Sequence, residues 1–156
     1  MMQIIRGDFA DPRVVALLDY HHRTMHAQTP KGSAHALDLK GLQSADIDFW
    51  TMWKNDAILG MGALKIFSPE QGEVKSMRTV EQALRQGIGG AMLRHIIGAA
   101  QAKGMARLNL ETGALPVFAP AVALYWRHGF TECAAFAPYR PNPNSIFMTL
   151  NLQAPR

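Results

Sequence analysis

Three glycines, at positions 87, 89 and 90, stand between a stretch of alternating residues and a stretch of helical periodicity. The alternating stretch is 73–80, and the helical stretch ends at Lys103. A strand, a glycine-rich turn and a helix in this order present free backbone N–H groups at a helix N-terminus, where the helix dipole also favours an anion. We therefore interpret the turn as the binding site of a phosphate-bearing cofactor.

The two familiar nucleotide-binding glycine motifs do not fit this turn. A P-loop needs a lysine and then a serine or threonine directly after its last glycine, whereas Ala91 and Met92 follow Gly90. A dinucleotide-binding turn needs a third glycine where Met92 stands, and it follows the first strand of its fold rather than about the fourth. The alternative to a cofactor site is a glycine-tolerant helix start that binds nothing.

The elements that must position this turn follow from periodicity and from turn residues. The expected strands are 2–6, 46–53, 57–67, 73–80, 106–112, 131–136 and 145–152. The expected helices are 12–26, 36–43, the helix after the glycines and 119–128. The apolar stripe of the helix after the glycines is expected to be Leu84, Ile88, Met92, Ile96 and Ala100. Helices that interrupt strands in this way predict a mixed α/β (α+β) protein, with helices on both faces of one sheet.

Length and composition suit one domain spanning residues 1–156. The apolar fraction is 48%, yet no apolar run approaches the roughly 18–20 residues that cross a bilayer, so we expect no membrane partner and no signal peptide. A single cysteine, Cys133, excludes an internal disulfide and favours the cytoplasm. The formal charge of +4 comes from scattered lysines and arginines, which argues against a nucleic-acid partner.

A second motif lies downstream of the glycines and reads Ala121-Val-Ala-Leu124-Tyr125-Trp-Arg-His-Gly129-Phe130. Together the two motifs resemble the GNAT superfamily of acyl-CoA-dependent N-acyltransferases, in which Gln/Arg-x-x-Gly-x-Gly/Ala precedes Ala-x-x-Leu-Tyr-x-x-x-Gly-Phe. The resemblance covers essentially the whole chain, and the strand at 73–79 resembles a poorly characterised bacterial branch. It implies a single mixed, mostly antiparallel sheet of about seven strands, with about four helices on its two faces.

The resemblance also implies acetyl-CoA as co-substrate and no metal. The pyrophosphate would be held by the turn, and the pantetheine arm would pair with the strand edge before it. The implied cofactor-binding residues are Met77, Arg78, Thr79, Arg85, Gln86, Gly87, Ile88, Gly89 and Gly90. Two positions depart from the family pattern. Leu84 stands at the first place of the turn, so that Arg85 is displaced by one, and Phe118 replaces a frequent asparagine.

Direct transfer to an amine needs a group that accepts a proton and a group that returns one. By the resemblance, Glu73 and Glu111 are the candidate bases, and Tyr125 is the candidate acid beside the thiolate. Each has a plainer alternative: the glutamates as surface or lysine-paired carboxylates, and Tyr125 as a packing residue. Strand alternation predicts that Glu73 shares one face with Lys75, Met77 and Thr79.

The leading hypothesis is a cytoplasmic N-acetyltransferase that acts on a primary amine of a small molecule or a peptide, as a monomer or a homodimer. The alternative is a non-catalytic acyl-CoA sensor or partner-binding module. His22 and His26 share a helix face, but no neighbouring ligand completes a metal site with them. Two segments are candidates for lining the acceptor pocket: the helix that carries His21 and the loop from Tyr139 to Ser145. For the second segment, an ordinary surface loop is an equal alternative.

Overall fold

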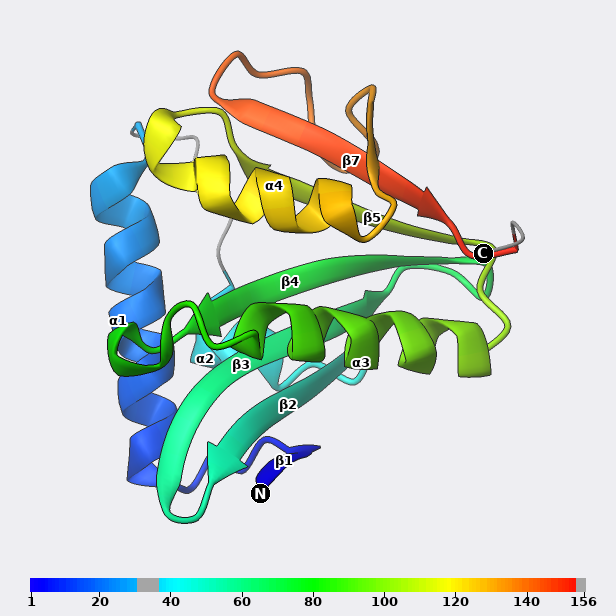
Figure 1. Ribbon diagram of the computed structural model, residues 1–156. Helices are drawn as coiled ribbons and strands as arrows, with labels where there is room; N and C mark the ends of the chain where they lie inside the picture. Colours follow the sequence, from blue (N-terminus) through cyan, green and yellow to red (C-terminus); the bar gives the residue numbers. More distant parts are fainter. Residues whose placement is uncertain (31–36, 154–156) are drawn as a thin grey trace.

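The computed structural model describes residues 1–30 and 37–153 (Figure 1). Its strands are β1 (Met2–Arg6), β2 (Ile47–Lys54), β3 (Ala57–Ile66), β4 (Gln71–Thr79), β5 (Arg107–Gly113), β6 (Thr131–Cys133) and β7 (Ser145–Asn151). Its α-helices are α1 (Pro12–Gln28), α2 (Leu39–Leu42), α3 (Ile88–Ala102) and α4 (Ala119–Arg127). Two short 3₁₀ turns, η1 (Glu81–Ala83) and η2 (Pro116–Phe118), precede α3 and α4.

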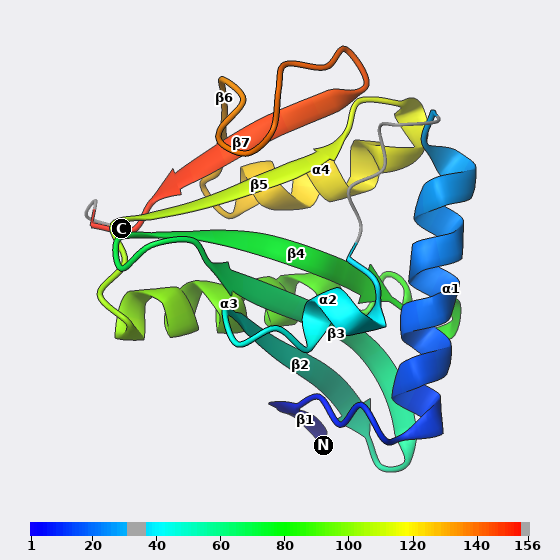
Figure 2. The same cartoon turned by 180° about the vertical axis from the view of Figure 1, so that it is seen from behind.

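The strands form one sheet in the order β1-β2-β3-β4-β5-β7-β6. Neighbouring strands are antiparallel except β4 and β5, which are parallel. Helices α3 and α4 cover one face, and α1 and α2 cover the other (Figures 1 and 2). The predicted fold class is therefore confirmed, as a mixed and mostly antiparallel seven-stranded sheet between two layers of helices.

The parallel pair at the centre of the sheet is incomplete. Strands β4 and β5 pair only from Gln71 opposite Arg107 to Glu73 opposite Asn109. Beyond that point the two strands diverge, and Figure 1 shows the opening between them. Among the described residues, the backbone of β4 after residue 73 therefore has no strand partner on its β5 side.

Helix α3 packs closely against the sheet because β3 carries glycines beneath it. A Cβ atom on Gly62 would lie 2.7 Å from the Met92 side chain and 2.9 Å from that of Ile96. Met92 and Ile96 are fully buried in the larger of two apolar clusters. The glycines thus let the helix approach, which fixes the position of its N-terminus beside β4.

Three element boundaries differ from prediction by three residues or more, and the others by one or two. Helix α3 begins at Ile88, so the expected place of Leu84 in its stripe is wrong: positive φ angles at Arg85 (65°) and Gly87 (81°) interrupt the helical path, and Leu84 is 54% exposed. Strand β6 ends at Cys133 rather than at 136, because Phe136 packs edge-on against Phe147 instead of continuing the ladder. Helix α2 spans Leu39–Leu42, and the expected start at 36 lies outside the described residues.

None of the helices in the described part of the chain combines the length and the apolar character needed to span a membrane.

Candidate active site

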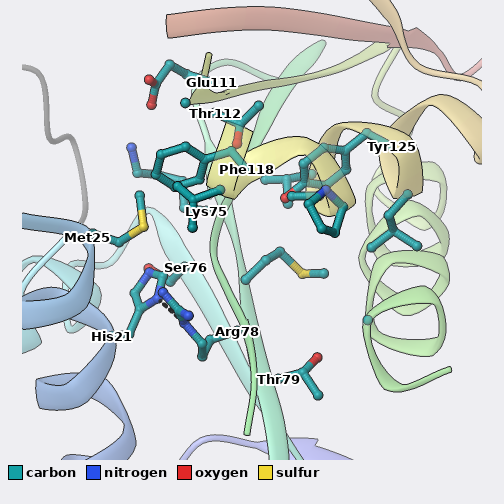
Figure 3. A pocket seen from close by; sticks show the side chains of 18 of the residues that line it. His21, Met25, Lys75, Ser76, Arg78, Thr79, Glu111, Thr112, Phe118 and Tyr125 are labelled. Carbon is teal, nitrogen blue, oxygen red and sulfur yellow. Dashed lines mark hydrogen bonds between the residues drawn. The ribbon is translucent and has the colours of Figure 1, made fainter. Parts of the chain in front are cut away.

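A cavity of about 410 Å³ opens where β4 and β5 diverge (Figure 3). It is lined on one side by α1 and on the other by the start of α3 and by α4, so it passes through the gap in the sheet. Polar side chains in its wall come from α1, β4 and β5, and they include His21, Glu73, Lys75, Ser76, Arg78, Glu111 and Thr112. The gap therefore connects a site on the α3/α4 face with a site on the α1 face.

A bulge in β4 sets the direction of the side chains that enter this cavity. The pairing of β3 with β4 shifts register beside Gly62, and Ser76 adopts φ 55°. An extra residue on one strand reverses the alternation that follows it. Met77 consequently packs into the core beneath α3, whereas Lys75 reaches the opposite side of the sheet.

The prediction that Glu73, Lys75, Met77 and Thr79 share one face is therefore wrong beyond Lys75. Thr79 lies on the α3 side, where its Oγ1 is 3.7 Å from the position of a Cβ on Gly89. The intervening residue, Arg78, turns toward α1. A regular alternating pattern does not show a bulge, so the sequence carried no signal for this change.

The glycine-rich turn lies at the α3 side of the cavity. Gly87 is the N-cap of α3 with φ 81°, and the first helical hydrogen bond runs from the Ala91 N–H to the Gly87 carbonyl, at 3.0 Å. The N–H groups of residues 88–90 thus have no acceptor inside the helix. Of these residues Gly89 lines the cavity, and a Cβ there would approach the Leu124 side chain to 3.1 Å.

The structure brings together only some of the predicted cofactor-binding residues. Met77, Arg78, Thr79 and Gly89 line the cavity, whereas the remainder of the turn does not: Arg85, Gln86, Gly87, Ile88 and Gly90. The Ile88 side chain is buried in the core, and Gly90 lies beside Arg94 and His128. A role for these five residues therefore depends on their backbone or on the surface just outside the cavity.

Tyr125 lies on α4 and points into the cavity (Figure 3). It is 7% exposed, and its ring packs against Phe130 with centroids 5.9 Å apart. Burial, together with the negative charge of Glu111, raises the pKa of Tyr125 to about 12. The phenol is therefore protonated at neutral pH and able to donate a proton or a hydrogen bond.

Glu73 is 4% exposed and belongs to a compact polar group. Its Oε2 accepts a 2.6 Å hydrogen bond from the Tyr139 hydroxyl and lies 3.3 Å from Lys75 Nζ. Lys75 also donates to the Tyr139 oxygen at 2.7 Å. Glu73 is thus a lysine-paired carboxylate, which was the plainer of its two interpretations. Burial and the charge of Glu73 raise the pKa of Tyr139.

Glu111 occupies the β5 wall of the same cavity. Its Oε2 accepts a 2.7 Å hydrogen bond from the Ser145 hydroxyl at the start of β7. The charge of Glu111 contributes to the raised pKa values of both Tyr125 and Tyr139. The two ends of the polar loop 139–145 therefore contact the two candidate glutamates. The sequence had left open whether this loop belongs to the site or is an ordinary surface loop.

The α1 side of the cavity holds two groups whose contact the sequence did not reveal. Arg78 Nε donates a 2.9 Å hydrogen bond to His21 Nδ1, shown as a dashed line in Figure 3. Burial and the charge of Arg78 lower the pKa of His21 to about 3, so the imidazole is neutral. The rings of His22 and His26 lie 4.4 Å apart at a tilt of 48° on α1, and no group of three or more potential metal ligands occurs among the described residues.

The divergent parallel strands, with a helix start and a tyrosine at their gap, define an acyltransferase fold, and the comparisons agree. The family model described as an acetyltransferase (GNAT) domain matches residues 45–132. The chain belongs to this GNAT acetyltransferase family.

Two bacterial relatives resemble nearly the whole chain. The uncharacterised N-acetyltransferase YedL of Escherichia coli is 42% identical, over 97% of this chain and 96% of the relative. The uncharacterised N-acetyltransferase YsnE of Bacillus subtilis is 43% identical, over 97% of this chain and 100% of the relative. The chain is therefore an acyltransferase of the N-acetyltransferase type.

Solved structures show the same fold. A Klebsiella pneumoniae protein assigned to the acyl-CoA N-acyltransferases has a TM-score of 0.81 at 27% identity, covering 97% of this chain and 98% of the other. The PaiA N-acetyltransferase of Thermoplasma acidophilum, solved in complex with coenzyme A, has a TM-score of 0.75 at 14% identity, covering 97% and 99%.

Proposed function

We propose that this protein transfers the acetyl group of acetyl-CoA directly to a primary amine. The observation that carries the proposal is the shared cavity, in which Tyr125 and Glu111 face the gap between β4 and β5. One end of that cavity meets the start of α3, and the other meets α1. A cofactor and an acceptor would thus enter from opposite faces of the sheet and meet at the gap.

The residues present fit coenzyme A. The first N–H groups of α3 would hold its pyrophosphate, since an α-helix start offers donors and a favourable dipole. The backbone of 77–79 would pair with its amides like an added strand, because β5 leaves that edge of β4 unpaired. Bound acetyl-CoA supplies a thioester: the amine nitrogen bonds to the carbonyl carbon, the C–S bond breaks, the amine loses a proton and the sulfur gains one.

The acceptor amine must lose a proton before it attacks. A lysine-like amine has a pKa of about 10.4, so the neutral form costs roughly 4–5 kcal/mol at pH 7. We assign the proton acceptor to Glu111, directly or through a water, because it lines the cavity on β5 and its charge acts on Tyr125. Glu73 is less suited, because Lys75 and Tyr139 already engage its Oε2.

Tyr125 would return a proton to the leaving sulfur. Its raised pKa keeps the phenol protonated throughout the neutral range. A group that must donate a proton to a thiolate benefits from a buried position, where water does not compete. The experiment is an amine screen with acetyl-CoA, in which free thiol and N-acetylated product are measured together. Equal amounts of both support the proposal, and the absence of product with every amine contradicts it.

A further inference from the structure

The guanidinium of Arg78 stands in the cavity wall, where it contacts a histidine and a tyrosine. Its Nε donates to His21, and its carbon lies 5.9 Å from the centre of the Tyr20 ring. Among residues 1–30 and 37–153, no carboxylate forms an ion pair with it. Glu81, whose charge acts on Arg78, instead accepts a 2.9 Å hydrogen bond from the Tyr20 hydroxyl.

The absence of an ion pair is unusual for this position, because Arg78 is half-buried. Burial lowers its pKa, which means that the surroundings disfavour its charge. Two arginines that are more exposed do have carboxylate partners: Arg6 lies 2.7 Å from Asp48, and Arg13 lies 2.8 Å from Asp11. A buried charge is costly unless it is paired. The structure thus contains a cation for which a bound anion would supply the missing partner.

A second, independent observation comes from Ser76, two residues earlier on β4. The residue is 9% exposed, its Oγ has no hydrogen-bond partner among the described residues, and it lines the same cavity. Figure 3 labels it with His21 and Arg78 among the residues that line this cavity. It also holds φ 55°, a conformation that costs a non-glycine residue free energy. A buried hydroxyl without a partner, at a strained position, needs an explanation beyond packing.

His21 adds a third donor to this wall. Because its Nδ1 accepts from Arg78 and the ring is neutral, its proton resides on Nε2. Arg78, Ser76 and His21 therefore offer N–H or O–H groups together with a positive charge. Such a set complements a carboxylate, whose two oxygens accept several hydrogen bonds from charged and neutral donors.

We propose that Arg78, Ser76 and His21 form a subsite for the carboxylate of the acceptor, and that the acceptor is an amino acid. The inference rests on the proposed function, since it names the substrate class of the same cavity. The amine would lie toward Glu111 on the opposite wall. The charges of the cavity favour this class. Among the described lining residues, Lys75 and Arg78 balance Glu73 and Glu111. A zwitterionic amino acid keeps the total charge of the cavity at zero, whereas a dianionic phosphate would not.

The test compares each standard amino acid with its own carboxamide, which keeps the amine and removes the negative charge. For the preferred side chain, wild-type protein should show a kcat/KM for the acid about ten- to a hundredfold above that for the amide. Arg78→Gln should abolish this preference, and Ser76→Ala should reduce it. Arg23→Gln is the matched control, because Arg23 also neighbours His21 on α1 but is exposed and paired with Asp19.

A binding measurement separates this inference from the proposed function. With coenzyme A present, amino acids should raise the melting temperature of wild-type protein and of Arg23→Gln, but not that of Arg78→Gln, and the carboxamides should have no effect. Stabilisation by coenzyme A alone shows that Arg78→Gln is folded. If no amine is acetylated, this binding still tests the subsite. Equal responses to acids and amides, or a preference that persists in Arg78→Gln, would overturn the inference.

Discussion

Tyr139 and Glu73 meet across the sheet, where the tyrosine hydroxyl donates a 2.6 Å hydrogen bond to Glu73 Oε2. The two residues stand 66 positions apart, so the contact ties the β6–β7 loop to β4. Lys75 touches both partners, at 3.3 Å from Glu73 Oε2 and 2.7 Å from the Tyr139 oxygen. Glu73 and Lys75 of this group line the cavity, and with Glu111 as the base the role of the group is mainly structural.

The two glutamates should therefore respond differently to substitution. Glu73→Gln leaves the ammonium of Lys75, whose side chain is 9% exposed, without a carboxylate. Breaking a buried pair in this way should lower the free energy of unfolding by about 3 kcal/mol. Denaturant titration measures this loss, and activity of the folded fraction should fall by less than about tenfold. A larger loss of turnover at unchanged stability would transfer the role of base to Glu73.

Glu111→Gln should have the opposite profile. Without a carboxylate to accept the proton of the amine, kcat should fall by about 10²- to 10⁴-fold at pH 7. Glutamine keeps an acceptor for the Ser145 hydroxyl, so the melting temperature and the affinity for acetyl-CoA should change little. A partial recovery of rate at high pH, where more of the amine is already neutral, would identify the lost step as proton removal.

Tyr125→Phe should lower turnover without weakening cofactor binding. The substitution removes the phenol that is placed to protonate the leaving sulfur, and general acids contribute about 10²- to 10⁴-fold. The ring that packs on Phe130 remains, so stability should be retained. Pre-steady-state and steady-state rates, together with the acetyl-CoA dissociation constant, separate chemistry from binding. An unchanged kcat would reduce Tyr125 to a packing residue.

His21 makes stability depend on pH in a defined window. Its folded-state pKa is lowered to about 3, against 6.5 for the free side chain. Below pH 6.5 the unfolded chain binds a proton that the folded protein excludes, so stability is lost as pH falls from about 6.5 toward 3. The slope from this residue is about 1.4 kcal/mol per pH unit. His21→Asn should flatten the dependence by that amount, and an unchanged slope would contradict the buried neutral histidine.

The start of α3 can be tested with two glycines of one helix. A leucine at Gly89 would fill the cavity side of the turn, where a Cβ already lies 3.1 Å from Leu124. A Cβ at Gly98 meets nothing within 4 Å, so Gly98→Leu serves as the control. Only Gly89→Leu should weaken acetyl-CoA binding, by about tenfold or more, measured by calorimetry. Equal affinities in the two variants would place the pyrophosphate elsewhere.

The fold could be predicted because its signals are local. The period of the apolar residues and the turn residues located every strand and α-helix of the described part of the chain, and the glycine-rich turn together with the motif from Ala121 to Phe130 identified the family. The errors at the element ends also have local causes: Leu84 fits the spacing of the α3 stripe, but the positive φ angles of Arg85 and Gly87 keep it out of the helix.

The site could be predicted only in part, because its contacts join distant residues. The sequence named Tyr125 and both glutamates, and all three line the cavity. It did not reveal the bulge at Ser76, since an inserted residue leaves the alternating pattern intact on each side. Without the bulge, Arg78 could not be placed beside His21, which lies 57 residues away. The contact of Glu73 with Tyr139 could not be predicted either, because the two residues are 66 positions apart in the sequence.

The central claim is amine-dependent transfer of acetyl, and one measurement tests it most directly. Purified protein is mixed with acetyl-CoA and an amine panel that includes the standard amino acids, and free thiol and N-acetylated product are quantified in the same samples. We predict equal amounts of both, only when an amine is present, with a loss of at least about a hundredfold in Glu111→Gln. Thiol release without product, or no turnover of any amine, would contradict the account.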